Sequence, residues 1–120
     1  MRLAFVDLVF TWPPAGGAPA DLYYTASGLQ SLGHEVRLFH AGFNDLPEAL
    51  VVRPELLPFA CERLPFSYRE YTPAVVPGRV RAAVDAYKPD IVFQCFGFFL
   101  KPYLTQALAD YPQIARYYAY

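Results

Sequence analysis

The chain has 120 residues, the size of one domain, of which 55% are hydrophobic and 18% are charged. Its net charge of -1 argues against a nucleic-acid-binding surface, because no excess of positive charge is present to neutralise phosphates. The longest apolar runs are far shorter than the roughly 20 residues that a membrane helix needs. With no targeting segment recognised, we expect one hydrophobic core in a cytoplasmic protein.

Cysteine usage indicates neither a disulfide framework nor a metal centre. The chain has two cysteines, Cys61 and Cys95, and we expect both to be reduced thiols. Cys95 lies in an apolar stretch and is expected in the core. We predict no bound metal and no cofactor.

The first forty residues alternate strand and helix patterns. Residues 3–6 are apolar without alternation, which is typical of a central parallel strand covered on both faces. A helix is predicted with Pro19 in its first turn and with Gly33 as its C-terminal cap. Residues 36–39 predict the second strand. The buried stripe of the helix is formed by apolar residues at helical spacing, namely Leu22, Ala26, Leu29 and Leu32.

Residues 41–73 are the least regular part of the chain. Prolines at positions 47, 54, 58, 65 and 73 divide it into short pieces, within which we predict a short helix near residues 47–50 and a strand near residues 61–64. Two hypotheses remain open for the aromatic and charged cluster that follows, which either lines a binding surface or packs over the edge of the sheet. This cluster consists of Phe66, Tyr68, Arg69, Glu70 and Tyr71.

The last third of the chain repeats the alternation. Pro77 begins a helix that Pro89 ends, and residues 91–96 predict the next strand. Residues 97–99 break this strand, Pro102 opens a third helix that Pro112 ends, and residues 114–120 predict a last strand. The buried stripes of the two helices are Val80, Val84 and Tyr87 in the first, and Leu104, Ala107, Leu108 and Tyr111 in the second.

This order of elements predicts an α/β fold. Strands that alternate with helices imply right-handed crossovers and a parallel sheet. We therefore expect residues 1–120 to form a single three-layer Rossmann-like domain with about five strands in the order 3-2-1-4-5. The ligand crevice of such a sheet lies between the first and fourth strands. This placement gathers residues 7, 10–17 and 96–99 at one edge.

A glycine pair, Gly16 and Gly17, lies between the first strand and the first helix. Backbone N–H groups at such a position can bind phosphate, and glycine lets a ligand approach the backbone closely. The alternative is a plain strand-to-helix turn in which the glycines satisfy geometry alone. The strict dinucleotide pattern G-x-G-x-x-G is absent.

Further candidate crevice residues follow the predicted strands. Asp7 either faces the ligand crevice or accepts backbone N–H bonds from the adjoining loop. His40 comes just past the second predicted strand, where both a crevice role and a structural role remain open. At the end of the fourth strand the candidates are Gln94, Phe96 and Gly97.

Three short motifs resemble the start of a GT-B glycosyltransferase of the family 4 type (glycosyl transferases group 1). They are Pro13-Pro14-Ala15-Gly16-Gly17, then Leu32-Gly33-His34-Glu35-Val36, and finally Lys88-Pro89-Asp90-Ile91-Val92 before the fourth strand. The resemblance as a whole covers residues 2–40 and 87–119.

This resemblance implies the acceptor-side, N-terminal domain of a transferase that moves a sugar from a nucleotide-sugar donor to an acceptor. By this resemblance, the C-terminal donor domain is absent from the chain. We therefore expect glycosyltransferase activity only when such a domain is joined to it, and an inactive domain otherwise. By the same resemblance, Gly16 and Gly17 offer N–H groups to the donor pyrophosphate or to the acceptor. The chain departs from the family at Phe93-Gln94-Cys95, where many members carry histidines, so no catalytic residue can be assigned.

Two alternatives from other functional classes stay open. The first is a stand-alone binding module, because cobalamin-binding domains begin in a similar way, although their D-x-H-x-x-G motif is absent here. The second is a dimerising interaction domain with Phe96, Phe98 and Phe99 near its mouth. The partners expected are therefore a nucleotide sugar and its acceptor, a membrane surface touched peripherally, or a second copy of the chain, and no nucleic acid.

Overall fold

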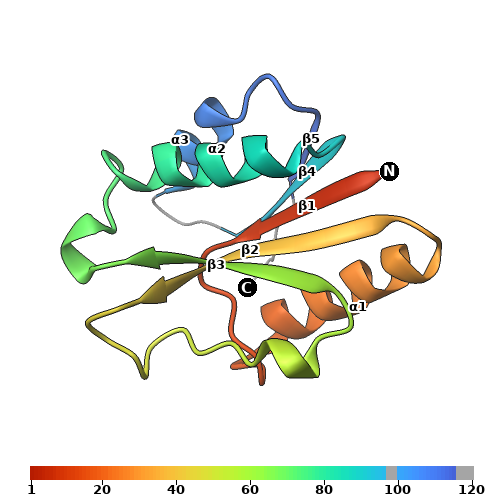
Figure 1. Ribbon diagram of the computed structural model, residues 1–120, viewed down its shortest axis with the longest axis horizontal. Coiled ribbons are helices and arrows are strands. Elements are labelled where there is room, and N and C mark those ends of the chain that lie inside the picture. Colours follow the sequence, from red (N-terminus) through yellow and green to blue (C-terminus); the bar gives the residue numbers. More distant parts are fainter. Residues whose placement is uncertain (97–99, 116–120) are drawn as a thin grey trace.

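The computed structural model describes residues 1–96 and 100–115 and shows a Rossmann-like α/β domain (Figure 1). Five strands form one sheet in the order β3-β2-β1-β4-β5, and every neighbouring pair is parallel. The predicted fold class and strand order are thus confirmed. The strands are β1 (Arg2–Asp7), β2 (Glu35–Phe43), β3 (Ala60–Phe66), β4 (Ile91–Phe96) and β5 (Gln113–Ala115).

Helices cover both faces of this sheet. Figure 1 shows α1 on one side and α2 and α3 on the other. Among the described helices, none is both long and apolar enough to cross a membrane. The helical elements are α1 (Gly17–Ser31), α2 (Val76–Tyr87), α3 (Lys101–Ala107) and the short 3-10 turns η1 (Pro54–Leu56) and η2 (Tyr68–Glu70).

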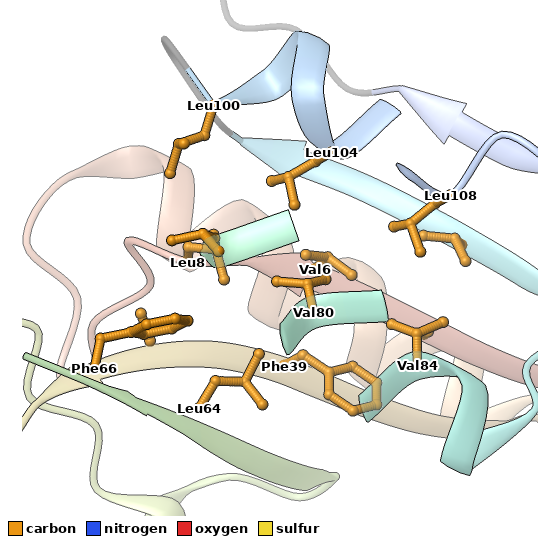
Figure 2. Packing of buried hydrophobic residues seen from close by; sticks show 14 of the residues in the cluster. Val6, Leu8, Phe39, Leu64, Phe66, Val80, Val84, Leu100, Leu104 and Leu108 are labelled. Atoms are coloured by element: carbon orange, nitrogen blue, oxygen red, sulfur yellow. The ribbon is translucent and has the colours of Figure 1, made fainter. Parts of the chain in front are cut away.

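The larger core lies between the sheet and the pair α2 and α3. Figure 2 shows Val6 and Leu8, from β1 and just after it, facing Val80 of α2 and Leu104 of α3. These four side chains are at most 2% exposed. The stripes predicted for the two helices therefore do point into the core, because residues three or four apart lie on one helix face.

The second core lies between the sheet and α1. Phe5 of β1 stacks on Phe93 of β4 with ring centroids 4.4 Å apart. Leu22 and Ala26 of α1 close this layer and are fully buried. The side chain of Cys95 is buried here too, as expected.

Several predicted boundaries are wrong. Helix α1 begins at Gly17 and has Pro19 in its first turn as predicted, but its end leaves Leu32 77% exposed, so that residue is not part of the buried stripe. The third helix ends at Ala107, well before Pro112. The last strand begins at Gln113, and residues 116–120 of its predicted range lie outside the described residues.

The proline-rich middle differs most from expectation. No helix forms at residues 47–50, where prolines and turns interrupt the backbone. Strand β2 extends to Phe43, past its predicted end, because its residues remain buried up to that position. Residues 44–59, which we call the covering segment, then cross the side of the sheet that carries α1 (Figure 1).

The aromatic cluster after β3 packs over the sheet. Phe66 is fully buried, and Tyr71 meets it edge-on with ring centroids 5.8 Å apart. Ser67 and Glu70 cap η2 reciprocally, which fixes this turn. Tyr68 is the exception, since it is 68% exposed. Of the two hypotheses for this cluster, packing therefore accounts for all of its aromatic residues except Tyr68.

Candidate functional site

The carboxyl ends of the parallel strands meet at one edge of the sheet, where open α/β sheets bind ligands. Asp7 ends β1 at this edge, beside Phe96 of β4, where the pairing register shifts. Its side chain is 2% exposed, and its Oδ1 accepts a hydrogen bond of 3.2 Å from the backbone N–H of Val9. Asp7 thus lies at the predicted switch point, and it also holds its own loop.

Burial has a strong effect on this carboxyl group. It raises the pKa of Asp7 from 3.8 to about 7, while the hydrogen bond from Val9 acts in the opposite direction. Burial and the charge of Asp7 together raise the pKa of the nearby Tyr71 hydroxyl to about 12. Asp7 consequently changes its protonation state near neutral pH, which is a property of many functional carboxyl groups.

The glycine pair has a clear geometric role. Gly16 caps α1 with φ 115° and ψ -174°, a conformation open essentially to glycine alone, and Gly17 is the first helical residue. The N-cap Gly16 makes no side-chain capping bond, and within the described part of the chain a Cβ at either glycine would meet nothing within 4 Å. The turn therefore requires glycine at position 16, whereas phosphate binding by the pair stays a prediction.

The loop that contains the glycines also supports the covering segment. Trp12 stacks on Tyr23 of α1 with ring centroids 4.4 Å apart. Its backbone N–H donates to the carbonyl of Val51 at 3.0 Å, and its carbonyl accepts from the N–H of Arg53 at 3.0 Å. The β1–α1 loop and the covering segment are thereby fastened together.

A cavity opens between this covering segment and the ends of β2 and β3, and we call it the His40 cavity. Its volume is about 150 Å³. Apolar side chains form most of its wall, and His40 and Arg63 supply the polar groups. The lining residues are His40, Gly42, Phe43, Pro47, Ala49, Leu50, Val51, Val52 and Arg63.

His40 lies inside β2 rather than just past it, because the strand ends several residues later than predicted. The side chain is 4% exposed, and its buried Nδ1 has no hydrogen-bond partner among the residues that the structure describes. Burial lowers the pKa of His40 below 6.5, the backbone of Ala41 raises it, and the charge of Arg63 lowers it again. The Ala41 backbone does not complete a hydrogen bond of normal geometry to Nδ1. His40 is therefore a neutral imidazole with one unmet polar atom.

Arg63 is the cation of this cavity. It stands opposite His40 in the pairing of β2 with β3, so both side chains lie on the same face of the sheet. Its guanidinium group lies directly over Gly42, where a Cβ would be only 2.1 Å from Nε. One nitrogen, Nη2, donates to Asn44 Oδ1 at 3.1 Å.

The structure separates the remaining predicted residues. Gln94 is buried within β4, where its amide donates to Gln113 Oε1 and its carbonyl accepts from Thr105 at 3.5 Å. These bonds tie β5 and α3 to the sheet and account for Gln94 structurally. Phe96 ends β4 beside Asp7, and Gly97 lies outside the described residues.

Of the residues that line the cavity, only His40 was a candidate from the sequence, and the two that contact each other over the backbone, Arg63 and Gly42, were missed. Arg63 lies in the proline-rich part of the chain, where no motif marks it, and Gly42 was not recognised as part of a strand. The one available signal was the tendency of side chains to alternate across a strand, which pairs position 40 with position 63 only once the register is known. No group of three or more His, Cys, Asp or Glu side chains suited to a metal occurs in the described ranges 1–96 and 100–115.

The fold is similar to that of a solved structure, the C-terminal domain of a hydrogenase from Pyrococcus furiosus. The TM-score is 0.58 and the sequence identity is 17%, with 95% of this chain and 89% of that chain covered. An identity this low shows a shared fold alone. No protein-family model matches the sequence, and no curated protein matches it.

These comparisons overturn the resemblance to the GT-B glycosyltransferases. No family model supports it, and the matching structure comes from a protein that is named a hydrogenase. The interpretation as the N-terminal domain of a nucleotide-sugar-dependent transferase is therefore wrong. The Rossmann-like fold, which that interpretation shared, is retained.

Proposed function

We propose that this chain is a small-molecule-binding module whose ligand occupies the His40 cavity. The observation that carries the proposal is the side chain of His40, which lines a cavity of about 150 Å³, is 4% exposed and holds an Nδ1 without a hydrogen-bond partner among the described residues. A buried polar atom without a partner costs roughly 1–3 kcal/mol, so its presence at a cavity wall favours a ligand that completes the bond.

The position of the cavity supports the same conclusion. It lies at the carboxyl ends of β2 and β3, the edge at which open α/β sheets bind ligands. Its wall is mostly apolar with a small number of polar groups, as in many small-molecule sites. A cavity of about 150 Å³ holds a molecule about the size of benzene, which favours a small ligand here over a macrocycle such as cobalamin.

A panel of small probes tests this proposal. We would record the backbone amide NMR signals of the protein with benzoate, benzamide, benzyl alcohol and inorganic phosphate, each at about 1 mM or above. At least one probe should shift the signals of Gly42, Leu50 and Val52, which line the cavity. The proposal fails if none of the four probes moves these signals.

A filled cavity provides the matched control. Ala49 lines the cavity, so Ala49→Leu should occupy part of the space and abolish the probe-induced shifts. Ala82 lies on the exposed side of α2, and Ala82→Leu should leave them unchanged. Equal binding by both variants would place the probe outside the cavity.

A further inference from the structure

We infer that the ligand of the His40 cavity is a small carboxylate with an apolar body, which Arg63 binds through its guanidinium group and His40 through Nδ1. This inference rests on the proposed function and adds the chemical class of the ligand. Three observations carry it: the lack of a carboxylate near Arg63 among the described residues, the glycine backbone against which its guanidinium group lies, and the apolar wall of the cavity.

Arg63, like Arg69, differs from the other arginines of the described residues in its charge environment. Five of them have a carboxylate within 4 Å, in pairs such as Arg2 with Glu35 and Arg37 with Glu62. For Arg63 no carboxylate of the described ranges lies within that distance, and its bond to Asn44 goes to a neutral amide. A guanidinium carries five N–H donors in a planar fork that matches a carboxylate, so most of its donors remain for a ligand.

Gly42 allows this guanidinium to lie against the backbone. A Cβ at position 42 would be 2.1 Å from Nε, 2.6 Å from Cζ and 2.8 Å from Nη2 of Arg63. The guanidinium group of Arg63 thus lies against the backbone of Gly42 and is hydrogen-bonded through one nitrogen to Asn44. Such a fixed guanidinium loses less side-chain freedom when it binds a planar anion.

The rest of the cavity selects among anions. Its wall is built largely from the side chains of residues such as Phe43, Leu50 and Val52, which cannot solvate a charge. Arg63 is exposed, so the anionic end of a ligand can lie at the mouth while its apolar body fills the interior. A monocarboxylate with a compact apolar body fits this division, whereas inorganic phosphate would bring a second charge and no apolar surface.

Benzoate is a suitable probe because its ring has the size that a cavity of about 150 Å³ accommodates. We would measure its affinity by isothermal titration calorimetry for the wild type and for Arg63→Met, which keeps an unbranched apolar stem but removes the charged guanidinium group. Arg63→Met should weaken benzoate at least about tenfold, as expected for the loss of a charge-assisted bidentate contact. Benzamide should bind both proteins with similar affinity.

Arg69 offers a matched control. It is exposed on η2, has no carboxylate within ion-pair distance among the described residues and does not line the cavity. Arg69→Met changes the net charge of the protein by the same amount as Arg63→Met. It should leave benzoate affinity unchanged, which separates a specific contact from a general loss of positive charge.

A second variant keeps Arg63 and disturbs the contact of its guanidinium group with the backbone of Gly42. Gly42→Ala should displace the guanidinium while leaving the fold intact, because the added Cβ meets only the far end of a flexible side chain. Benzoate binding should weaken severalfold, whereas Gly28→Ala on the exposed side of α1, where a Cβ meets nothing within 4 Å, should have no effect. Far-ultraviolet circular dichroism confirms that each variant is folded.

The outcomes distinguish the inference from the proposed function. If benzamide or benzyl alcohol shifts the cavity signals and benzoate does not, the carboxylate inference is wrong and the binding module stands. If inorganic phosphate binds more tightly than benzoate in an Arg63-dependent way, the site is an anion site of another kind and the inference is also wrong. If no probe binds in the cavity, both fail.

Discussion

Asp7 and His40 show how burial alone can give a side chain functional character. Each is almost fully removed from solvent at or near the carboxyl edge of the sheet. Burial raises the pKa of Asp7 and lowers the pKa of His40, and both shifts favour the neutral form of the side chain. Asp7 is held by a backbone bond within its own loop, whereas Nδ1 of His40 has no partner. The difference explains why the cavity, rather than the switch point, carries the functional proposal.

The carboxyl group of Asp7 should make stability depend on pH. Its pKa is about 7 in the folded chain against an ordinary 3.8, so the folded state binds more protons between these values and the free energy of unfolding falls as pH rises through them. Asp7→Asn removes this titration. Relative to wild type, the variant should gain roughly 4 kcal/mol between about pH 4 and about pH 8, measured by urea unfolding.

Glu48→Gln is the control for that series, because Glu48 is exposed and the substitution removes the same formal charge. Its stability difference from wild type should stay flat over the same pH range. A flat profile for Asp7→Asn as well would show that the Asp7 carboxyl group is not desolvated in the folded protein.

The turn between β1 and α1 shows what the glycine pair does for its elements. Gly16 has φ 115° and ψ -174°, which few other residues adopt, whereas Gly17 has no such requirement. We expect Gly16→Ala to lower the free energy of unfolding by about 1–3 kcal/mol. Gly17→Ala should change it by at most about 1 kcal/mol and in the stabilising direction, since alanine is the better helix former. Equal losses in thermal denaturation would refute the distinction.

Packing of α3 against the sheet should dominate the stability of the C-terminal part. Leu104 is 1% exposed within the core of Figure 2, and Leu104→Ala should cost about 2–5 kcal/mol through lost burial and the cavity left behind. Leu32 is 77% exposed at the end of α1, so Leu32→Ala should fall within about 0.5 kcal/mol of wild type. Chemical denaturation measures both, and a small loss for Leu104→Ala would mean that α3 is not firmly packed.

Over the whole molecule, the sequence predicted the order of elements far better than the function. Apolar runs and helical stripes are set by burial, which is why the sheet order and the stripes of α2 and α3 were predicted correctly. The irregular middle was not, because its shape depends on contacts between residues distant in sequence. Trp12, for example, pairs with residues 51 and 53.

The wrong family assignment has a physical explanation in the motifs on which it rested. Gly16 and Gly33 have positive φ values of 115° and 97°, and Lys88 ends α2 with φ 56°. Asp90 accepts a bond of 2.8 Å from the backbone N–H of Arg2, which aligns β4 with β1. Each motif residue therefore serves a turn or a strand start that any parallel α/β sheet needs. Such motifs indicate the fold rather than the family.

The measurement that tests the central claim most directly is the side-chain NMR spectrum of His40 during a titration with benzoate. The chain has two histidines, and His34, outside the cavity, serves as an internal reference. Our account predicts that the Nδ1 resonance of His40 moves to a saturating end point while that of His34 stays in place, and that Arg63→Met weakens the effect. An unchanged His40 resonance at saturating benzoate would contradict the binding of a carboxylate beside Nδ1 of His40 in this cavity.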